Sequence, residues 1–166
     1  LAQDIPVVCV VVNMTTRRPL AESEVDLLLT RIIASKHCDL KYYDLAIDET
    51  ALFLADSLAN RPQLVIQSVD ITGTRITVKG LQLLVSALIP KRSLQIFTAR
   101  ACMLTKDAAA VLAKLIVAPG CLQQLDLRDN LLGDNGVAAL CAALNSPQSL
   151  EPSSSVYSLA SLDLSA

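Results

Sequence analysis

The sequence has few aromatic residues, no tryptophan and little charge of either sign. Aromatic residues make up 3% of the 166-residue chain, whereas 52% of it is apolar and 18% is charged. A chain of this length is about one domain and can bury a substantial core. That core must be aliphatic. The shortage of bulky rings favours many similar small layers over one large hydrophobic centre.

A basic surplus and long apolar runs are also absent. The net charge of -2 argues against a nucleic-acid binder, which needs a basic face to displace counterions. The longest apolar run, residues 5–12, has eight residues, whereas a membrane-spanning helix needs about 20. No signal peptide is recognisable. We therefore expect neither nucleic acid nor a membrane among the partners.

The cysteines lack the spacing of a metal site or a disulfide framework. They are odd in number and contain no CxxC pair, which predicts neither zinc nor structural disulfides. We infer a reducing, intracellular compartment, the cytoplasm. The five are Cys9, Cys38, Cys102, Cys121 and Cys141.

Groups for catalysis are equally sparse. His37 is the only histidine and stands beside Cys38, but neighbouring residues of one strand point to opposite faces, so we interpret the pair as structural. No P-loop, nucleophile elbow or cluster of metal ligands is present. The loop "DNLLGDNG", residues 129–136, lacks the alternating ligands of a calcium loop. The sequence predicts a protein that is not an enzyme and has no cofactor or metal.

The sequence does contain a gapless repeat of 28 residues. Residues 122–144 match residues 94–116, and these match residues 66–88, with an apolar or small residue in every recurring column. A looser copy matches at an offset of 29, which places Leu40 with Val69 and Tyr42 with Ile71. Units are predicted to start near residues 5, 37, 66, 94, 122 and 159, and a Ser/Pro-rich insert, 145–158, is predicted to be an exposed loop.

Each unit predicts a short strand followed by a helix. In "LQQLDLRDN", residues 122–130, the leucines at positions 4 and 6 alternate with polar residues, so they should face the core while the polar residues face away. Asn130 ends the stretch, where the chain leaves the strand. We expect its amide to satisfy backbone groups of its own unit and of the adjacent unit. Cys102 and Thr74 stand in the same column and should do so more weakly.

These units resemble the leucine-rich repeat of the ribonuclease-inhibitor type, LxxLxLxxN/CxL followed by a helix. The likeness covers most of the chain and is strongest over residues 66–144. It implies an α/β solenoid, a right-handed horseshoe with parallel strands on the concave face and helices on the convex face. Residues 1–166 would form a single leucine-rich-repeat domain in which neighbouring units supply the core. We interpret the chain as a fragment of a longer solenoid.

Binding is the function that this pattern favours. Positions 3, 5, 7 and 8 of each unit would line the open face of the sheet, in lanes whose members are about 4.8 Å apart. We predict a protein-binding face centred on the two arginines of position 7. Its residues would be Tyr43, Arg100, Gln124, Asp126, Arg128 and Asp129. The alternative interpretation is that Asp126 and Asp129 flank Arg128 and neutralise the pair of arginines in an idle, solvated surface.

The resemblance implies a non-catalytic module or scaffold that binds another protein, within a larger protein or assembly. Two alternatives stay open. One is a regulatory repeat domain that acts on a GTPase, similar to the repeats of the GTPase-activating proteins for Ran. The other is the ligand-sensing repeat region of an innate-immune receptor, which would require a nucleotide-binding domain upstream. Fold alone does not decide among them.

Overall fold

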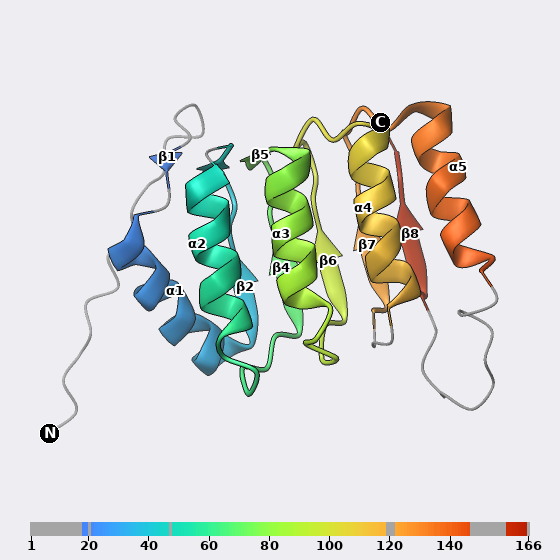
Figure 1. The fold of residues 1–166 in the computed structure, drawn as a ribbon. Coiled ribbons are helices and arrows are strands. Elements are labelled where there is room, and N and C mark those ends of the chain that lie inside the picture. Colours follow the sequence, from blue (N-terminus) through green and yellow to red (C-terminus); the bar gives the residue numbers. More distant parts are fainter. Residues whose placement is uncertain (1–17, 20, 47, 119–121, 147–158, 166) are drawn as a thin grey trace, which may run out of the picture.

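The computed structural model describes residues 18–19, 21–46, 48–118, 122–146 and 159–165. The predicted unit near residue 5 and residues 147–158 of the predicted insert lie outside this part of the chain. Within it, short strands alternate with helices in an α/β arrangement of two layers (Figure 1). The α/β class predicted from the sequence is therefore confirmed.

The main sheet has five parallel strands in the order β2-β4-β6-β7-β8. Neighbours in the sheet also follow one another along the chain, so each connection between them can carry a helix on the same side. The strands are short, and the central residue of each of the first four is buried. They are β2 (His37–Asp39), β4 (Ser68–Asp70), β6 (Ile96–Thr98), β7 (Gln124–Asp126) and β8 (Ser161–Asp163).

The helices of the described residues cover one face of this sheet and leave the other face open (Figure 1). We call the uncovered side the open face. Thr77 caps α3 by accepting a hydrogen bond from the Gly80 backbone N–H at 2.9 Å, which fixes where that helix begins. The helices are α1 (Glu22–Ser35), α2 (Asp48–Ala59), α3 (Val78–Leu88), α4 (Lys106–Val117) and α5 (Gly133–Leu144).

The core lies between the sheet and the helices and is mainly aliphatic, with Phe97 as its largest buried side chain. Phe97 sits at the centre of β6 with 0% of its surface exposed, between Val69 of β4 and Leu125 of β7. Small residues bring the helices close to one another: a Cβ added to Gly136 of α5 would meet the Cα of Lys106, in α4, at 3.3 Å. The Phe97 ring therefore occupies the middle of a core that otherwise consists of Leu, Ile, Val and Ala side chains and the thiols of Cys38 and Cys102, with Tyr43 packed partly buried against it.

A second, three-stranded parallel sheet borders the first, at the edge where the chain leaves the strands for the helices. It has the order β1-β3-β5, with β1 at Arg18–Pro19, β3 at Tyr43–Leu45 and β5 at Arg75–Ile76. A salt bridge of 3.6 Å joins Arg75 to Asp44 across β5 and β3. The repeat pattern did not predict this sheet, because its strands lie in the stretch of each unit where we expected only a turn from strand to helix.

The predicted register of the segment around Leu40 is wrong by two residues. Strand pairing places Cys38, not Leu40, beside Val69, an offset of 69 − 38 = 31 rather than 29. The corresponding unit therefore starts near residue 35 instead of 37. A shift of two residues keeps the same side chains on the same face of a strand, so alternation alone cannot distinguish the two registers. Tyr42 then falls beside Gly73 rather than in the core.

Backbone conformation agrees with the corrected register. The residue that follows each of the strands β2, β4, β6 and β7 by three positions has a positive φ, which turns the chain away from the sheet. At Gly73 a side chain would be excluded for a second reason, since an added Cβ would lie 2.6 Å from the ring of Tyr42. The residues of this turn are Tyr42 (φ 60), Gly73 (φ 69), Ala101 (φ 51) and Asp129 (φ 57).

Candidate protein-binding face

Asn130 holds the turn after β7 against the preceding strand-helix segment. Its Nδ2 donates to the backbone carbonyl of Ala99 at 2.6 Å and to that of Leu127 at 2.8 Å. Its Oδ1 accepts from the backbone N–H of Cys102 at 3.1 Å and of Leu104 at 3.0 Å. The expectation that this amide serves both its own segment and the adjacent one is confirmed.

Cys102 and Thr74 play the same part with fewer bonds. The Cys102 thiol donates to the carbonyl of Ile71 at 2.9 Å, and the Thr74 hydroxyl donates to that of Leu40 at 2.6 Å. Each side chain thus ties its turn to the preceding segment, in the weaker form expected of a group with fewer donors and acceptors. These ties hold the ends of the strands in register and so position the side chains of the open face.

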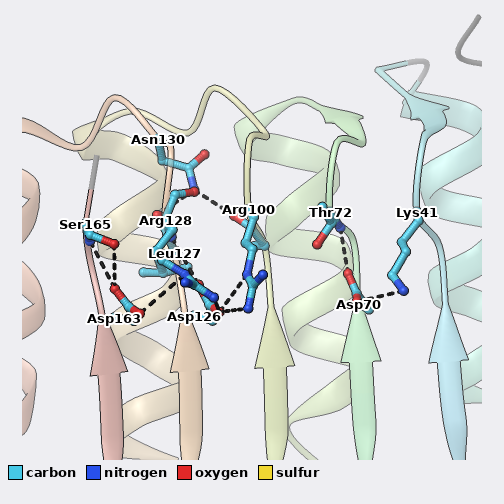
Figure 2. Close-up of polar contacts among 11 residues, drawn as sticks. Lys41, Asp70, Thr72, Arg100, Asp126, Leu127, Arg128, Asn130, Asp163 and Ser165 are labelled. Carbon is cyan, nitrogen blue, oxygen red and sulfur yellow. Dashed lines mark hydrogen bonds and ion pairs between the residues drawn. The ribbon is translucent and has the colours of Figure 1, made fainter. Parts of the chain in front are cut away.

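Two lanes of polar side chains cross the open face, one at each strand's end and one two residues further (Figure 2). The strand pairing aligns Asp39, Asp70, Thr98, Asp126 and Asp163 in the first lane. The residues two positions later form the second lane: Lys41, Thr72, Arg100, Arg128 and Ser165. The first lane contains four carboxylates and the second contains three basic groups.

The aspartates of the first lane also hold the backbone of the second. Asp70 accepts a hydrogen bond from the backbone N–H of Thr72 at 2.9 Å, and Asp126 accepts one from that of Arg128 at 3.3 Å (Figure 2). Asp39 and Asp163 do the same for Lys41 and Ser165, at 3.1 and 3.2 Å. Such local bonds are typical of aspartate at the start of a turn and preorganise the side chains that follow.

Ion pairs run diagonally, from a base on one strand to a carboxylate on the next. Lys41 lies 3.2 Å from Asp70, and Arg100 donates through Nε to Asp126 at 2.7 Å. Arg128 contacts Asp126 at 2.9 Å and reaches Asp163 at 3.3 Å. One carboxylate, Asp126, therefore serves two guanidinium groups (Figure 2).

The charge state of Asp126 follows from these contacts. Burial by itself would raise the pKa of its carboxyl, but hydrogen bonds from Arg128 and Arg100 outweigh the burial and hold the pKa below its ordinary value. The carboxylate is thus ionised at neutral pH, and it links β6 to β7. Its side chain is 17% exposed, so solvent screens these contacts only in part.

Replacing Asp126 with asparagine should lower stability at neutral pH and have less effect in acid. A carboxyl with a depressed pKa in the folded state stabilises the protein above its unfolded pKa, and this contribution is lost as pH falls through the folded pKa. We expect the difference in melting temperature between the native protein and Asp126→Asn to stay constant from pH 7 to about pH 5 and to shrink from there to about pH 2. Calorimetry across this range measures it. A melting-temperature difference that stays constant down to about pH 2 would show that the ionised Asp126 carboxylate does not stabilise the fold.

The structure brings together most of the predicted binding residues. Arg100, Arg128 and Asp126 form one network, and Gln124 is exposed two residues before Asp126 on the same side of β7. Asp129 is exposed at the turn, and it makes no salt bridge within the described part of the chain. Asp163 contacts Arg128 directly, and the charge of Asp129 also acts on Arg128, though without a salt bridge.

Tyr43 does not belong to this face. It lies in β3, pairs with Arg18 of β1 and packs partly buried against the core. Lys41 takes the place predicted for Tyr43 in the lane of Arg100, because of the two-residue shift in register. The sequence carries a signal for Lys41, since Asp39-Leu40-Lys41 repeats the pattern of residues 126–128.

His37 and Cys38 do not form a reactive pair. Cys38 is fully buried, and burial, followed by the charge of Asp39, raises the pKa of its thiol to about 12. The thiol is therefore protonated at neutral pH and points into the core. The His37 ring lies on the other side of β2, with Nδ1 2.5 Å from the hydroxyl of Ser68. The geometry agrees with a structural role for both residues.

The described ranges contain no group of three His, Cys, Asp or Glu side chains placed to hold a metal ion. None of the helices in these ranges is both long enough and apolar enough to span a membrane. Comparison with known proteins adds no family: no family model matches the chain, and no curated protein matches it.

Proposed function

We propose that the chain is a leucine-rich-repeat protein of the ribonuclease-inhibitor type, an α/β solenoid with its parallel strands on the inner side of the curve. Three features support this proposal: the 28-residue period of the sequence, the parallel pairing of successive strands, and the turn-binding column of Thr74, Cys102 and Asn130. In such an array each unit is stabilised by its neighbours.

The proposed function is non-catalytic binding of another protein through the open face. The observation that carries it is the set of aligned polar lanes on the side of the sheet that no described helix covers (Figure 2). Their backbone is held by side-chain hydrogen bonds, so a partner would meet a preorganised surface at a small cost in entropy. The free thiols of Cys38, Cys102 and Cys141 fit a role in a reducing, intracellular compartment.

Replacing both Arg100 and Arg128 with glutamine should abolish binding of the partner. Glutamine preserves much of each side chain's bulk but removes the charges that set orientation and charge-assisted hydrogen bonds. Loss of two such contacts should weaken binding by at least about a hundredfold. The immobilised protein would be used to capture partners from a cell lysate, with bound proteins quantified by mass spectrometry.

A control variant with the same change in charge is available on the helical side of the molecule. Arg31 of α1 and Lys114 of α4 are exposed, and their replacement by glutamine should leave capture unchanged. Circular dichroism would verify the fold of both variants. If the Arg100→Gln and Arg128→Gln variant still captured the partner and the Arg31→Gln and Lys114→Gln variant did not, binding would lie on the helices. That result would overturn the proposal.

A further inference from the structure

The lanes of the open face are interrupted between β4 and β6. Each base of the second lane pairs with the aspartate of the next strand: Lys41 with Asp70, and Arg100 with Asp126. Between them the corresponding pair is Thr72 and Thr98, which carry no charge. The interruption thus lies near the middle of the sheet, with ion pairs on both sides (Figure 2).

The interruption leaves Arg100 with fewer carboxylates than the other bases of the face. Lys41 has two carboxylates near it, Asp39 on its own strand and Asp70 on the next. Burial is the largest single influence on the pKa of Lys41 and lowers it, but the contacts and charges of the aspartates outweigh burial and raise this pKa. Arg128 likewise has an aspartate two residues earlier and another on the next strand. Arg100 has Thr98 two residues earlier instead.

The one carboxylate that Arg100 contacts is shared. Asp126 also accepts from Arg128, through Nε at 3.1 Å and Nη2 at 2.9 Å. Arg100 binds it only through Nε and Nη2, and its side chain remains 43% exposed. Within the described residues no hydrogen bond engages Nη1 of Arg100.

Hydroxyl groups and an apolar side chain lie at or next to the position of the missing aspartate. The side-chain hydroxyls of Thr72 and Thr98 have no hydrogen-bond partner within the described residues and are partly exposed. Ile96 precedes Thr98 by two residues on the same side of β6 and is 36% exposed. A donor, two hydroxyls and an apolar contact therefore surround the place where the repeated aspartate is missing.

We propose that the protein partner supplies the missing carboxylate: an acidic side chain, Asp or Glu, seats above Thr98 and pairs with Arg100. This inference rests on the proposed binding through the open face and names the chemistry of the segment bound there. The carboxylate would give Arg100 a second acid, as Lys41 and Arg128 already have. Charge complementarity of this kind orients a partner and sets specificity more than it adds affinity.

A partner carboxylate fits this place better than a partner base does. Asp70 and Asp126 on the flanking strands are already paired with Lys41, Arg100 and Arg128, so an incoming cation would have to displace an existing ion pair. An incoming carboxylate meets Nη1 of Arg100 and two hydroxyls without breaking a contact. Arginine is also the side chain best suited to bind a second carboxylate oxygen.

The test uses hexaglutamate as a probe and nuclear magnetic resonance as the readout. Titrating the peptide into the isotopically labelled protein should shift the Arg100 Nε–H resonance and the backbone amides of Thr72 and Thr98 in a saturable manner. Hexalysine at the same concentration should leave these three resonances unchanged. An Arg100 resonance that hexaglutamate does not shift would overturn the inference.

Four variants separate charge from size. Thr98→Asp supplies the carboxylate internally and should weaken hexaglutamate binding by at least about tenfold, whereas Thr98→Asn, of similar size but neutral, should retain it. Arg100→Gln should lose binding, and Arg92→Gln, an exposed arginine in the loop after α3, should not. Equal binding by Thr98→Asp and the native protein would also overturn the inference.

The outcomes distinguish this inference from the broader proposal. If hexalysine shifts Asp70 and Asp163 while hexaglutamate leaves Arg100 unchanged, the open face still binds but its ligand is basic, and the acidic partner is excluded. If a captured protein loses affinity for the Arg100→Gln and Arg128→Gln double variant yet binds Thr98→Asp normally, the open face is the binding site and the carboxylate does not sit above Thr98.

Discussion

Replacing Asn130 with alanine is expected to lower the free energy of unfolding by about 3 kcal/mol. The change removes a donor to the Ala99 and Leu127 carbonyls and an acceptor for the Cys102 and Leu104 N–H groups. A partly buried backbone group that loses its only side-chain partner costs about 1–3 kcal/mol, and water can reach some of these groups. Chemical denaturation followed by circular dichroism measures the change.

Two further variants make this prediction specific. Asn60 follows α2, is exposed, and makes no side-chain hydrogen bond within the described residues, so Asn60→Ala should change stability by no more than about 0.5 kcal/mol. Asn130→Asp keeps the acceptor but loses the donor, so it should fall between the native protein and Asn130→Ala. A loss for Asn130→Ala no larger than that for Asn60→Ala would show that the turn does not depend on this amide.

Replacing Phe97 with alanine is expected to cost about 3–5 kcal/mol. Phe97 is fully buried at the centre of β6, and its ring fills the core between the strands on either side. Alanine would leave a cavity that the short neighbouring side chains cannot close. The free energy of unfolding would therefore fall both because less apolar surface is buried and because of the cavity. The midpoint of urea denaturation should fall accordingly, with little change in the slope.

The sequence provides a matched control, because Phe53 is its only other phenylalanine. Phe53 lies on α2 with 40% of its surface exposed, so Phe53→Ala should cost no more than about 1 kcal/mol. The same chemical change then tests burial alone. Similar losses for the two variants would mean that the core does not depend on the Phe97 ring.

Much of the fold could be predicted from regular spacing. Leucines at positions 4 and 6 of residues 122–130 indicated a strand with one buried face, and Leu125 and Leu127 are 1% exposed. The Asn130 column was predictable because an amide where a strand ends has few roles other than binding backbone groups. The second sheet was not predicted, since β3 and β5 lie in the stretch between strand and helix, where we expected only a turn.

The candidate site was predicted only in part. Arg100, Arg128 and Asp126 were identified because gapless copies of the repeat aligned them. Tyr43 was wrong because the copy around Leu40 has a different length, and a shift of two residues leaves the alternation of buried and exposed side chains intact. The repeated Asp-x-Lys/Arg pattern would have indicated Lys41 in its place.

By itself, the sequence determined the α/β class, the aliphatic core and the side chains that would face away from it, because period and composition are local properties of the chain. Only the tertiary structure decided the register of β2 and the pairing of charges on the open face. Ion pairs such as Arg100–Asp126 join different strands, so they depend on which residues the backbone ladder sets side by side. The gapless copies already align Thr98 with Asp70 and Asp126, but Asp39 joins their lane only once that ladder is known.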